Sequence, residues 1–409
     1  MNFTFYLPET QKVSGPIYLR VLDESFRLDF VFLTGIMMAP QEWDAEKERP
    51  KNIYLKKNKN ISAVLDRIKV ELAEYIRQRK TGKKAVTKTG ISKKLSEIIT
   101  AKALQQPENS FLSLTLSYIT VRKEMICHST YKRYLVFFRL LQRFEGFLHR
   151  RLILTNINAE FVRDFFIFGK KEEYSENTLH RTIHFVKTIL NFAEKKGMVT
   201  HVRELEVRRE KKPARIIILT ESEIAKIKQT EVPEEYVTAK DWLLISCYTG
   251  QRISDFMVFN KSQLSETGSR MYITFIQQKT RKEIILPLHP VVLNILKEND
   301  YCFPDPIDHD IYNRRIRKIA RLAGINEQIN ARKRTGHRSE DTFVKKWEVI
   351  SSHIGRRSFA SNFYGKIPTP LLMQATGHST EKMFLNYINH NSHERLATLG
   401  NYFEQLYAG

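Results

Sequence analysis

The chain has 409 residues and a hydrophobic content of 42%, which is enough for ordinary packed cores and argues against a disordered protein. Its formal net charge is +22, so we expect a polyanionic partner: DNA or RNA first, a membrane surface second, and a merely basic surface as the remaining alternative. Its three scattered cysteines argue against disulfides and a zinc site and favour a reducing cytoplasm. Its start argues against a secretory signal, and its apolar runs are too short for membrane spans.

The first block of the chain, residues 1–88, reads as a small sheet with one helix. Three stretches rich in β-branched and aromatic residues are predicted strands: Phe3–Leu7, Ile17–Leu22 and Arg27–Leu33. From Asn60 the apolar residues follow helical spacing up to Ile76. Residues 80–94 are basic and poor in apolar side chains, which predicts a linker, and a short helix around Leu95–Leu104 follows it.

The second block, residues 106–198, reads as a compact basic bundle of helices. Each predicted helix carries an apolar stripe: Phe111–Lys123, Ser129–Phe147, Asn158–Gly169 and Ser175–Lys196. Ser175 suits the cap of the last helix, and Gly197 suits its end. Residues 199–216 form a second predicted linker.

The third block, residues 217–409, is predicted to be mostly helical. Two strands, Met271–Ile276 and Lys282–Pro287, flank a turn of Lys, Thr and Arg. The chain as a whole is therefore expected to be mainly α, with small β-sheets.

Two candidate functional residues lie in the first half of this block. Arg252 follows the apolar helix Trp242–Tyr248 and a glycine, so it stands at the mouth of a core, and Asp255 is positioned to orient it or to cap the next helix. Lys279 lies at the tip of the predicted hairpin, from which it can reach a phosphate or a leaving oxygen. Taken singly, a surface arginine and a solvated turn lysine are the simpler interpretations.

Two further motifs follow. His353 and Arg356 are three residues apart and share one face of a helix, where a guanidinium beside an imidazole can grip a phosphate and keep a proton acceptor near. His378 follows Gly377 in a predicted tight turn, and Tyr387 lies near the end of the next short helix. A tyrosine beside a basic cluster can attack phosphorus, although a core tyrosine packed on its own helix is the simpler interpretation.

In this order and spacing the motifs resemble the tyrosine recombinase, or phage integrase, family. The stretches Gly250–Asp255, Ser352–Ser361 and Gly377–Tyr387 are similar to its arginine box, its His-x-x-Arg box and its Gly-His…Tyr segment, with Asp255 where many members have Glu. The resemblance implies three domains: an arm-type DNA-binding α+β domain at 1–88, a helical core-binding, SAM-like domain at 106–198, and a catalytic domain at 217–409. The first match is the weakest and rests on a few residues, among them Thr34 and Trp43.

The resemblance also implies a role for each motif residue. Tyr387 is the expected nucleophile, which forms a 3′-phosphotyrosyl bond. Arg252 and Arg356 are expected to hold the phosphate oxygens, with His378 donating a further hydrogen bond. Lys279 is expected to protonate the leaving 5′ oxygen. His353 is expected to accept the tyrosine proton or orient the phosphate, and Asp255 to steady the site.

Partners and cofactors follow from the same comparison. Acidic residues near the motifs are few and ungrouped, and no Walker loop is present, so neither metal, ATP nor another cofactor is expected. Double-stranded DNA and a tetramer on DNA are the expected partners, with a host DNA-bending protein and an excisionase as further ones, in the bacterial nucleoid. A C-terminal stripe is expected either to cover the chain's own core or to pack into a neighbouring protomer: His393, Leu396, Leu399, Phe403 and Leu406.

Three other functions remain open on the sequence. A type IB topoisomerase shares the chemistry, but the two upstream DNA-binding blocks favour site-specific recombination. A resolvase shares the family, but the first 85 or so residues favour an integrase. A DNA-binding architectural protein with a decayed site is disfavoured by the presence of every catalytic residue type. The segment Arg332–Arg334 with His337 is interpreted as a loop that contacts the DNA backbone.

Overall fold

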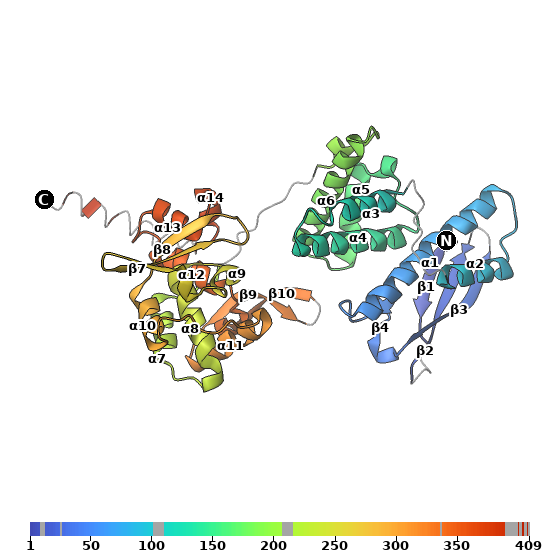
Figure 1. Ribbon diagram of the computed structural model, residues 1–409. Coiled ribbons are helices and arrows are strands. Elements are labelled where there is room, and N and C mark those ends of the chain that lie inside the picture. The colour runs from blue at the N-terminus through green and yellow to red at the C-terminus, as the bar shows by residue number, and fades with distance from the viewer. Residues whose placement is uncertain are drawn as a thin grey trace. The chain divides into compact units, whose positions relative to one another are not determined.

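The computed structural model describes residues 1–8, 13–24, 27–100, 110–206, 216–335 and 338–388, with residues 400, 403, 404 and 407 near the C-terminus. The chain divides into two compact units, Met1–Lys211 and Lys212–Gly409. In both units helices predominate and the sheets are small and antiparallel, which confirms the predicted fold class (Figure 1). Among the described residues no helix is long and apolar enough to cross a bilayer.

The first unit begins with a three-stranded sheet in the order β1–β2–β3. Its strands are β1 (Asn2–Tyr6), β2 (Gly15–Asp23) and β3 (Leu28–Met38), all three at predicted positions. Alternate residues such as Phe5 and Leu19 are buried, so one face of the sheet belongs to a core shared with the long helix α1 (Lys56–Thr81). A small hairpin of β4 (Trp43–Asp44) and β5 (Arg49–Pro50) lies between sheet and helix in the sequence.

The predicted linker at 80–94 is wrong in its second half. Helix α2 (Lys88–Thr100) begins inside it and packs against α1 and β3. Ile91, Leu95 and Ile98 lie at helical spacing, and all three are buried. The lysines between them dominate the composition, whereas the three apolar residues determine the structure.

Four helices form the second block, as predicted. They are α3 (Phe111–Arg122), α4 (His128–Leu148), α5 (Ala159–Lys171) and α6 (Glu176–Glu194). Ser175 caps α6 by accepting a hydrogen bond from the Thr178 N–H, and Gly197 takes a left-handed φ of +79° just beyond that helix. A phenylalanine-rich core holds the bundle together.

The first two blocks pack together within one compact unit, through α1 and α4. Asp66 of α1 is buried against Gly146 of α4, where any added Cβ would come within 2.6 Å of its carboxylate. Beside it, Glu172 forms ion pairs with Arg49 at 3.2 Å and with Arg143 at 2.5 Å. The division of the chain into three domains stays a prediction, but the first two of them are joined by buried charged groups.

The second unit is organised around helix α8 (Glu234–Thr249), whose Trp242 is fully buried. The sheet of β6 (Leu264–Thr267), β7 (Arg270–Ile276) and β8 (Glu283–Pro287) contains both predicted strands and one that was not predicted. The other helices of this unit are α7 (Glu221–Gln229), α9 (Ile253–Phe256), α10 (Pro290–Glu298), α11 (His309–Leu322), α12 (Ile354–Phe363), α13 (Thr369–Thr376) and α14 (Glu381–Leu385).

Two predictions for this unit need comment. The segment around Arg332 is not a loop, because it belongs to a hairpin of β9 (Gln328–Thr335) and β10 (Arg338–Lys345) in which Arg332 lies opposite Asp341. His337 lies outside the described residues. So does the predicted C-terminal stripe, except for Phe403, which is exposed.

Candidate active site

The end of α8 positions Arg252. Gly250 adopts a φ of +67° at the C-cap, and an added Cβ there would come within 2.5 Å of the Phe359 ring of α12. This close approach brings α8 and α12 together and turns the chain toward Arg252, the N-cap residue of α9. Asp255 is buried, accepts a hydrogen bond from the Gln278 N–H at 2.9 Å and lies 3.9 Å from the Arg252 guanidinium. Its role in orienting Arg252 stays a prediction.

Gln277 connects the separate parts of the site. Its side-chain carbonyl accepts hydrogen bonds from Arg252 (3.3 Å) and from the Thr280 hydroxyl in the hairpin turn (2.6 Å). Its amide nitrogen donates to Gln251 Oε1 (3.0 Å) and to the Thr376 carbonyl (3.1 Å). Because Gln277 is fully buried, these four bonds hold the arginine, the hairpin and the turn before His378 in one arrangement.

Arg356 lies at the centre of the site and is fully buried. One terminal nitrogen donates to the Gly250 carbonyl at 3.0 Å, and the other donates to the Thr376 carbonyl at 2.7 Å and contacts His378 Nε2 at 3.1 Å. Burial, followed by the nearby positive charge of Arg252, lowers the pKa of Arg356 to about 10. Its Nε–H is buried within the described part of the chain and has no hydrogen-bond partner there.

His378 lies in the predicted turn, between the left-handed Gly377 and the Thr380 cap of α14. The Thr376 hydroxyl donates to the Leu372 carbonyl at 2.6 Å and lies 2.8 Å from His378 Nδ1, so this network assigns the ring proton to Nδ1. Nε2 then accepts from Arg356. Burial and the charges of Arg356 and neighbouring basic groups lower the pKa of His378 to about 3, so the ring is neutral at physiological pH.

Tyr387 lies just past α14 and faces both of these residues. Its ring centroid is 4.8 Å from that of His378 and 5.3 Å from the Arg356 guanidinium carbon. The tyrosine is half-buried and also belongs to a small core with Phe384, so it packs as a core residue while reaching the basic cluster.

Lys279 and His353 are the exposed members of the predicted set. Lys279 lies in the turn between β7 and β8, and the neighbouring Lys282 donates from its ammonium to Ser379 at 3.0 Å, which ties the hairpin to the His378 turn. His353 precedes α12. Partial burial and the charges of Arg357, Arg356, Arg252 and Lys279 lower the pKa of His353, which indicates that these cations lie around it.

The site therefore concentrates positive charge around a neutral imidazole and a tyrosine. All six predicted catalytic residues, with Asp255 beside them, come from segments that the fold brings to one place. Such an arrangement can bind an anionic tetrahedral group, since it offers arginine and lysine donors on several sides. Among the described residues, no three His, Cys, Asp or Glu side chains form a group that could hold a metal ion. Independence of divalent metal stays a prediction.

Sequence reasoning missed the polar residues behind the catalytic set, Gln251, Gln277 and Thr376. One signal for Gln277 was present: strand alternation buries Ile273 and Phe275 on one face of β7, and Gln277 continues that face. A buried glutamine at the end of a core-facing strand needs polar partners, and the motif residues supply them. Gln251 and Thr376 carry no comparable signal, because Gln251 lies in a loop and Thr376 is the last residue of α13, where no strand alternation marks the buried side.

Two family models match the chain. The model of the phage integrase family matches residues 218–394, and the model of the phage integrase SAM-like domain matches residues 110–203. No curated protein sequence matches the chain.

Several solved structures share the fold. A lambda integrase dimer bound to a core site is 16% identical, with a TM-score of 0.52 over 67% of this chain and 94% of that one. The integrase of transposon Tn1549 in complex with a circular-intermediate DNA is 13% identical, with a TM-score of 0.53 over 69% and 95%. A lambda integrase tetramer bound to a Holliday junction is 16% identical, with a TM-score of 0.51 over 72% and 86%.

Proposed function

The chain belongs to the phage integrase family of tyrosine recombinases, and from this premise we propose that Tyr387 attacks a DNA phosphate gripped by Arg252 and Arg356. The protein is a site-specific recombinase. The finer proposal is that it integrates and excises a mobile element by cutting and rejoining DNA through a 3′-phosphotyrosyl intermediate.

The chemistry balances without a cofactor. The Tyr387 oxygen bonds to phosphorus as the bond from phosphorus to the 5′ oxygen breaks. His353 takes the tyrosine proton, and Lys279 gives a proton to the leaving 5′ oxygen. The phosphotyrosyl bond retains the energy of the phosphodiester, so the reverse attack by a 5′ hydroxyl rejoins a strand without ATP.

The arrangement around Arg356 is the observation that carries this proposal. A fully buried guanidinium with an unpartnered Nε–H lies under the Tyr387 ring and against His378. The three motifs that carry Arg252, Arg356 and Tyr387 come from different parts of the third block, and they meet around one site that could hold a phosphate. Arg49 and Arg143 of the first unit also have an unpartnered nitrogen, but both pair with the carboxylate of Glu172. Arg356 instead lies beside a second arginine, a histidine and a tyrosine, which suits the binding of an anion from outside the chain.

His378 has to change its proton position when a phosphate arrives. In the DNA-free site Nε2 accepts from Arg356, whereas donation to a phosphate oxygen needs a proton on Nε2. The negative charge of the phosphate offsets the cations that lower the pKa of His378. The Thr376 hydroxyl can either donate to or accept from Nδ1, so it is compatible with both proton positions.

The remaining partners are proposed by analogy with the solved structures. Those integrases are bound to core-site DNA or, as a tetramer, to a Holliday junction. We extend this to double-stranded attachment sites and a tetramer of this chain, acting at the bacterial nucleoid. The first block would bind arm-type sites, and a host DNA-bending protein and an excisionase would complete the assembly.

A type IB topoisomerase is the second candidate, because it uses the same covalent step. The helical block and the N-terminal block of the first unit favour recombination, since relaxation of supercoils needs no recognition of two separate sites. A plasmid with two core sites distinguishes the two functions. Deletion or inversion of the intervening segment supports the recombinase, and relaxation without either product supports the topoisomerase.

The test is covalent capture on a nicked suicide substrate that contains the core site, followed by a denaturing gel. Wild type is expected to give a protein–DNA band in excess chelator, and Tyr387→Phe is expected to give none. Tyr364→Phe, which removes another hydroxyl from the same small core, is the control and should still give the band. An adduct formed by Tyr387→Phe would refute the assignment, and magnesium-dependent capture would refute the metal-free mechanism.

A further inference from the structure

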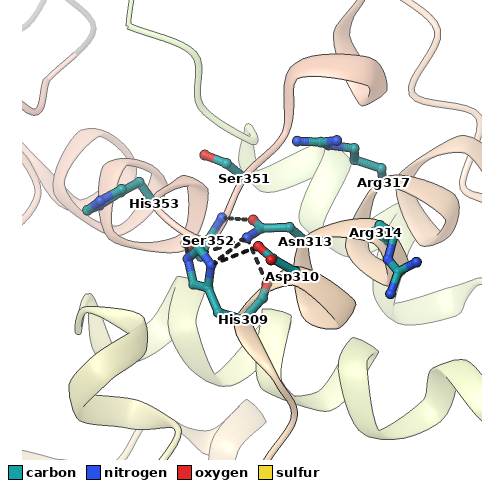
Figure 2. A pocket seen from close by; sticks show the side chains of 8 residues that line it. All are labelled: His309, Asp310, Asn313, Arg314, Arg317, Ser351, Ser352 and His353. Carbon is teal, nitrogen blue, oxygen red and sulfur yellow. Dashed lines mark hydrogen bonds and ion pairs between the residues drawn. The ribbon is translucent and has the colours of Figure 1, made fainter. Parts of the chain in front are cut away.

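A polar pocket lies beside the active site. It is formed by the first turns of α11 and the segment that precedes α12, and its volume is about 480 Å³ (Figure 2). The pocket is lined by polar side chains: His309, Asp310, Asn313, Arg314, Arg317, Ser351, Ser352 and His353. A single water occupies about 30 Å³, so the space is sufficient for a hydrated phosphate group.

Hydrogen bonds across the pocket hold its two walls together. Asn313 Oδ1 accepts from the Ser352 N–H at 2.8 Å, and Arg317 Nε donates to the Ile350 carbonyl at 2.9 Å. His309 Nε2 lies 3.2 Å from the hydroxyl of Ser352, which is itself buried. These contacts join α11 to the chain before α12, so the shape of the pocket is set before any ligand binds.

The lining favours an anion. Arg314 is exposed, and the single bond from Arg317 Nε leaves the terminal nitrogens of that guanidinium to line the pocket. One carboxylate, that of Asp310, opposes them, but its side chain is 93% exposed to solvent and lies 3.5 Å from His309. The first amides of α11 are already capped by Asp308, so the attraction comes from the two arginines and not from the helix end.

His353 connects this pocket to the catalytic site. Its side chain lines the pocket, and Arg356 lies three residues later, about one turn of helix away. A phosphate held by Arg356 would therefore lie close to the pocket. We propose that this pocket binds a backbone phosphate next to the scissile one, through Arg314 and Arg317, and fixes the strand for attack. The inference rests on the proposed function.

The experiment measures the rate of covalent capture when single phosphates are made neutral. A core site is first selected from a random-sequence library by Tyr387-dependent capture. Suicide substrates are then made with one methylphosphonate at each phosphate that flanks the scissile one. Each is tested with wild type, Arg314→Ala and Arg317→Ala. Arg321→Ala is the matched control, because it removes the same charge from the same helix but lies over the Trp347 ring, outside the pocket lining.

One flanking methylphosphonate is expected to slow capture by wild type about tenfold or more, the effect of losing a charge-assisted hydrogen bond. Arg314→Ala should slow capture of unmodified DNA similarly, and should show no further loss at that one position. Arg321→Ala should keep the full methylphosphonate effect. Arg314→Ala makes the result independent of any folding defect in Arg317→Ala, since Arg317 also holds the Ile350 carbonyl.

Three outcomes are decisive. If each methylphosphonate slows capture by Arg314→Ala by the same factor as it slows wild type, at every position tested, the pocket does not bind the backbone and the inference is wrong. If inorganic phosphate, at constant ionic strength, inhibits wild type but not Arg314→Ala, it competes with the backbone phosphate for the pocket and the inference is supported. If the library yields no Tyr387-dependent adduct at all, the proposed function itself fails.

Discussion

Replacing Gln277 by Leu should slow DNA cleavage strongly while leaving DNA binding nearly unchanged. The substitution removes all four side-chain hydrogen bonds of this fully buried residue. Gln251 Oε1 is left buried without its donor, at a cost of about 1–3 kcal/mol in stability. Arg252 and the hairpin that carries Lys279 lose their common anchor, and a displacement of about 1 Å can reduce a rate by about 100-fold.

The assay is single-turnover covalent capture with DNA binding measured in parallel. Gln278→Leu is the matched control, because it is the next residue, of the same type, with an exposed side chain. The rate of capture at saturating DNA should fall about 100-fold for Gln277→Leu and stay within about twofold for Gln278→Leu. Equal rates for the two variants, with both still folded, would refute the positioning role of Gln277.

Three further predictions concern stability and local strain. Gly377→Ala should lower both thermal stability and the rate of capture more than Gly324→Ala does. Both glycines have a φ near +70°, but only the added Cβ at 377 meets a side chain, at 2.5 Å. Equal losses for the two variants in thermal unfolding and in capture would contradict this. Glu172→Ala should cost about 3–5 kcal/mol in urea unfolding, since it leaves two arginines unpaired, whereas exposed Glu173→Ala should cost under about 1 kcal/mol. Burial raises the pKa of the Glu145 carboxyl from 4.5 to about 7, so the folded state loses stability as the pH rises through that window. Glu145→Gln should therefore raise the free energy of unfolding by up to about 3 kcal/mol at pH 8 and leave it unchanged near pH 4. A gain that does not depend on pH would exclude this cause.

Periodicity in the sequence predicted most of the secondary structure because each helix buries one apolar stripe. It failed where charged residues are interleaved with short apolar runs. In α2 three isoleucine and leucine residues fix the helix among lysines, and in β9 the buried Ile329 and Ala331 alternate with polar residues before a basic run. In both segments the composition suggested a linker or a loop. The few apolar residues nevertheless follow the pattern of the element that forms, helical spacing in α2 and alternation in β9.

The candidate site was predictable because its residues lie in short motifs with fixed spacing. What holds them together was not, since it consists of contacts between residues far apart in the sequence. Arg356 donates to the carbonyls of Gly250 and Thr376, and Gln277 bonds to Gln251. The buried ion pairs between Arg49, Arg143 and Glu172 were equally hidden, because no local pattern says which distant charges will meet.

The most direct test of the central claim is to identify the amino acid that is linked to DNA. The covalent adduct is digested with trypsin and nuclease, and the remaining peptides are analysed by mass spectrometry. The tryptic peptide Met383–Arg395 contains Tyr387 as its single tyrosine, whereas Tyr402 and Tyr407 fall in the next peptide. We expect the nucleotide on Met383–Arg395. A nucleotide on the peptide that begins at Leu396, or on any residue other than Tyr387, would contradict the account.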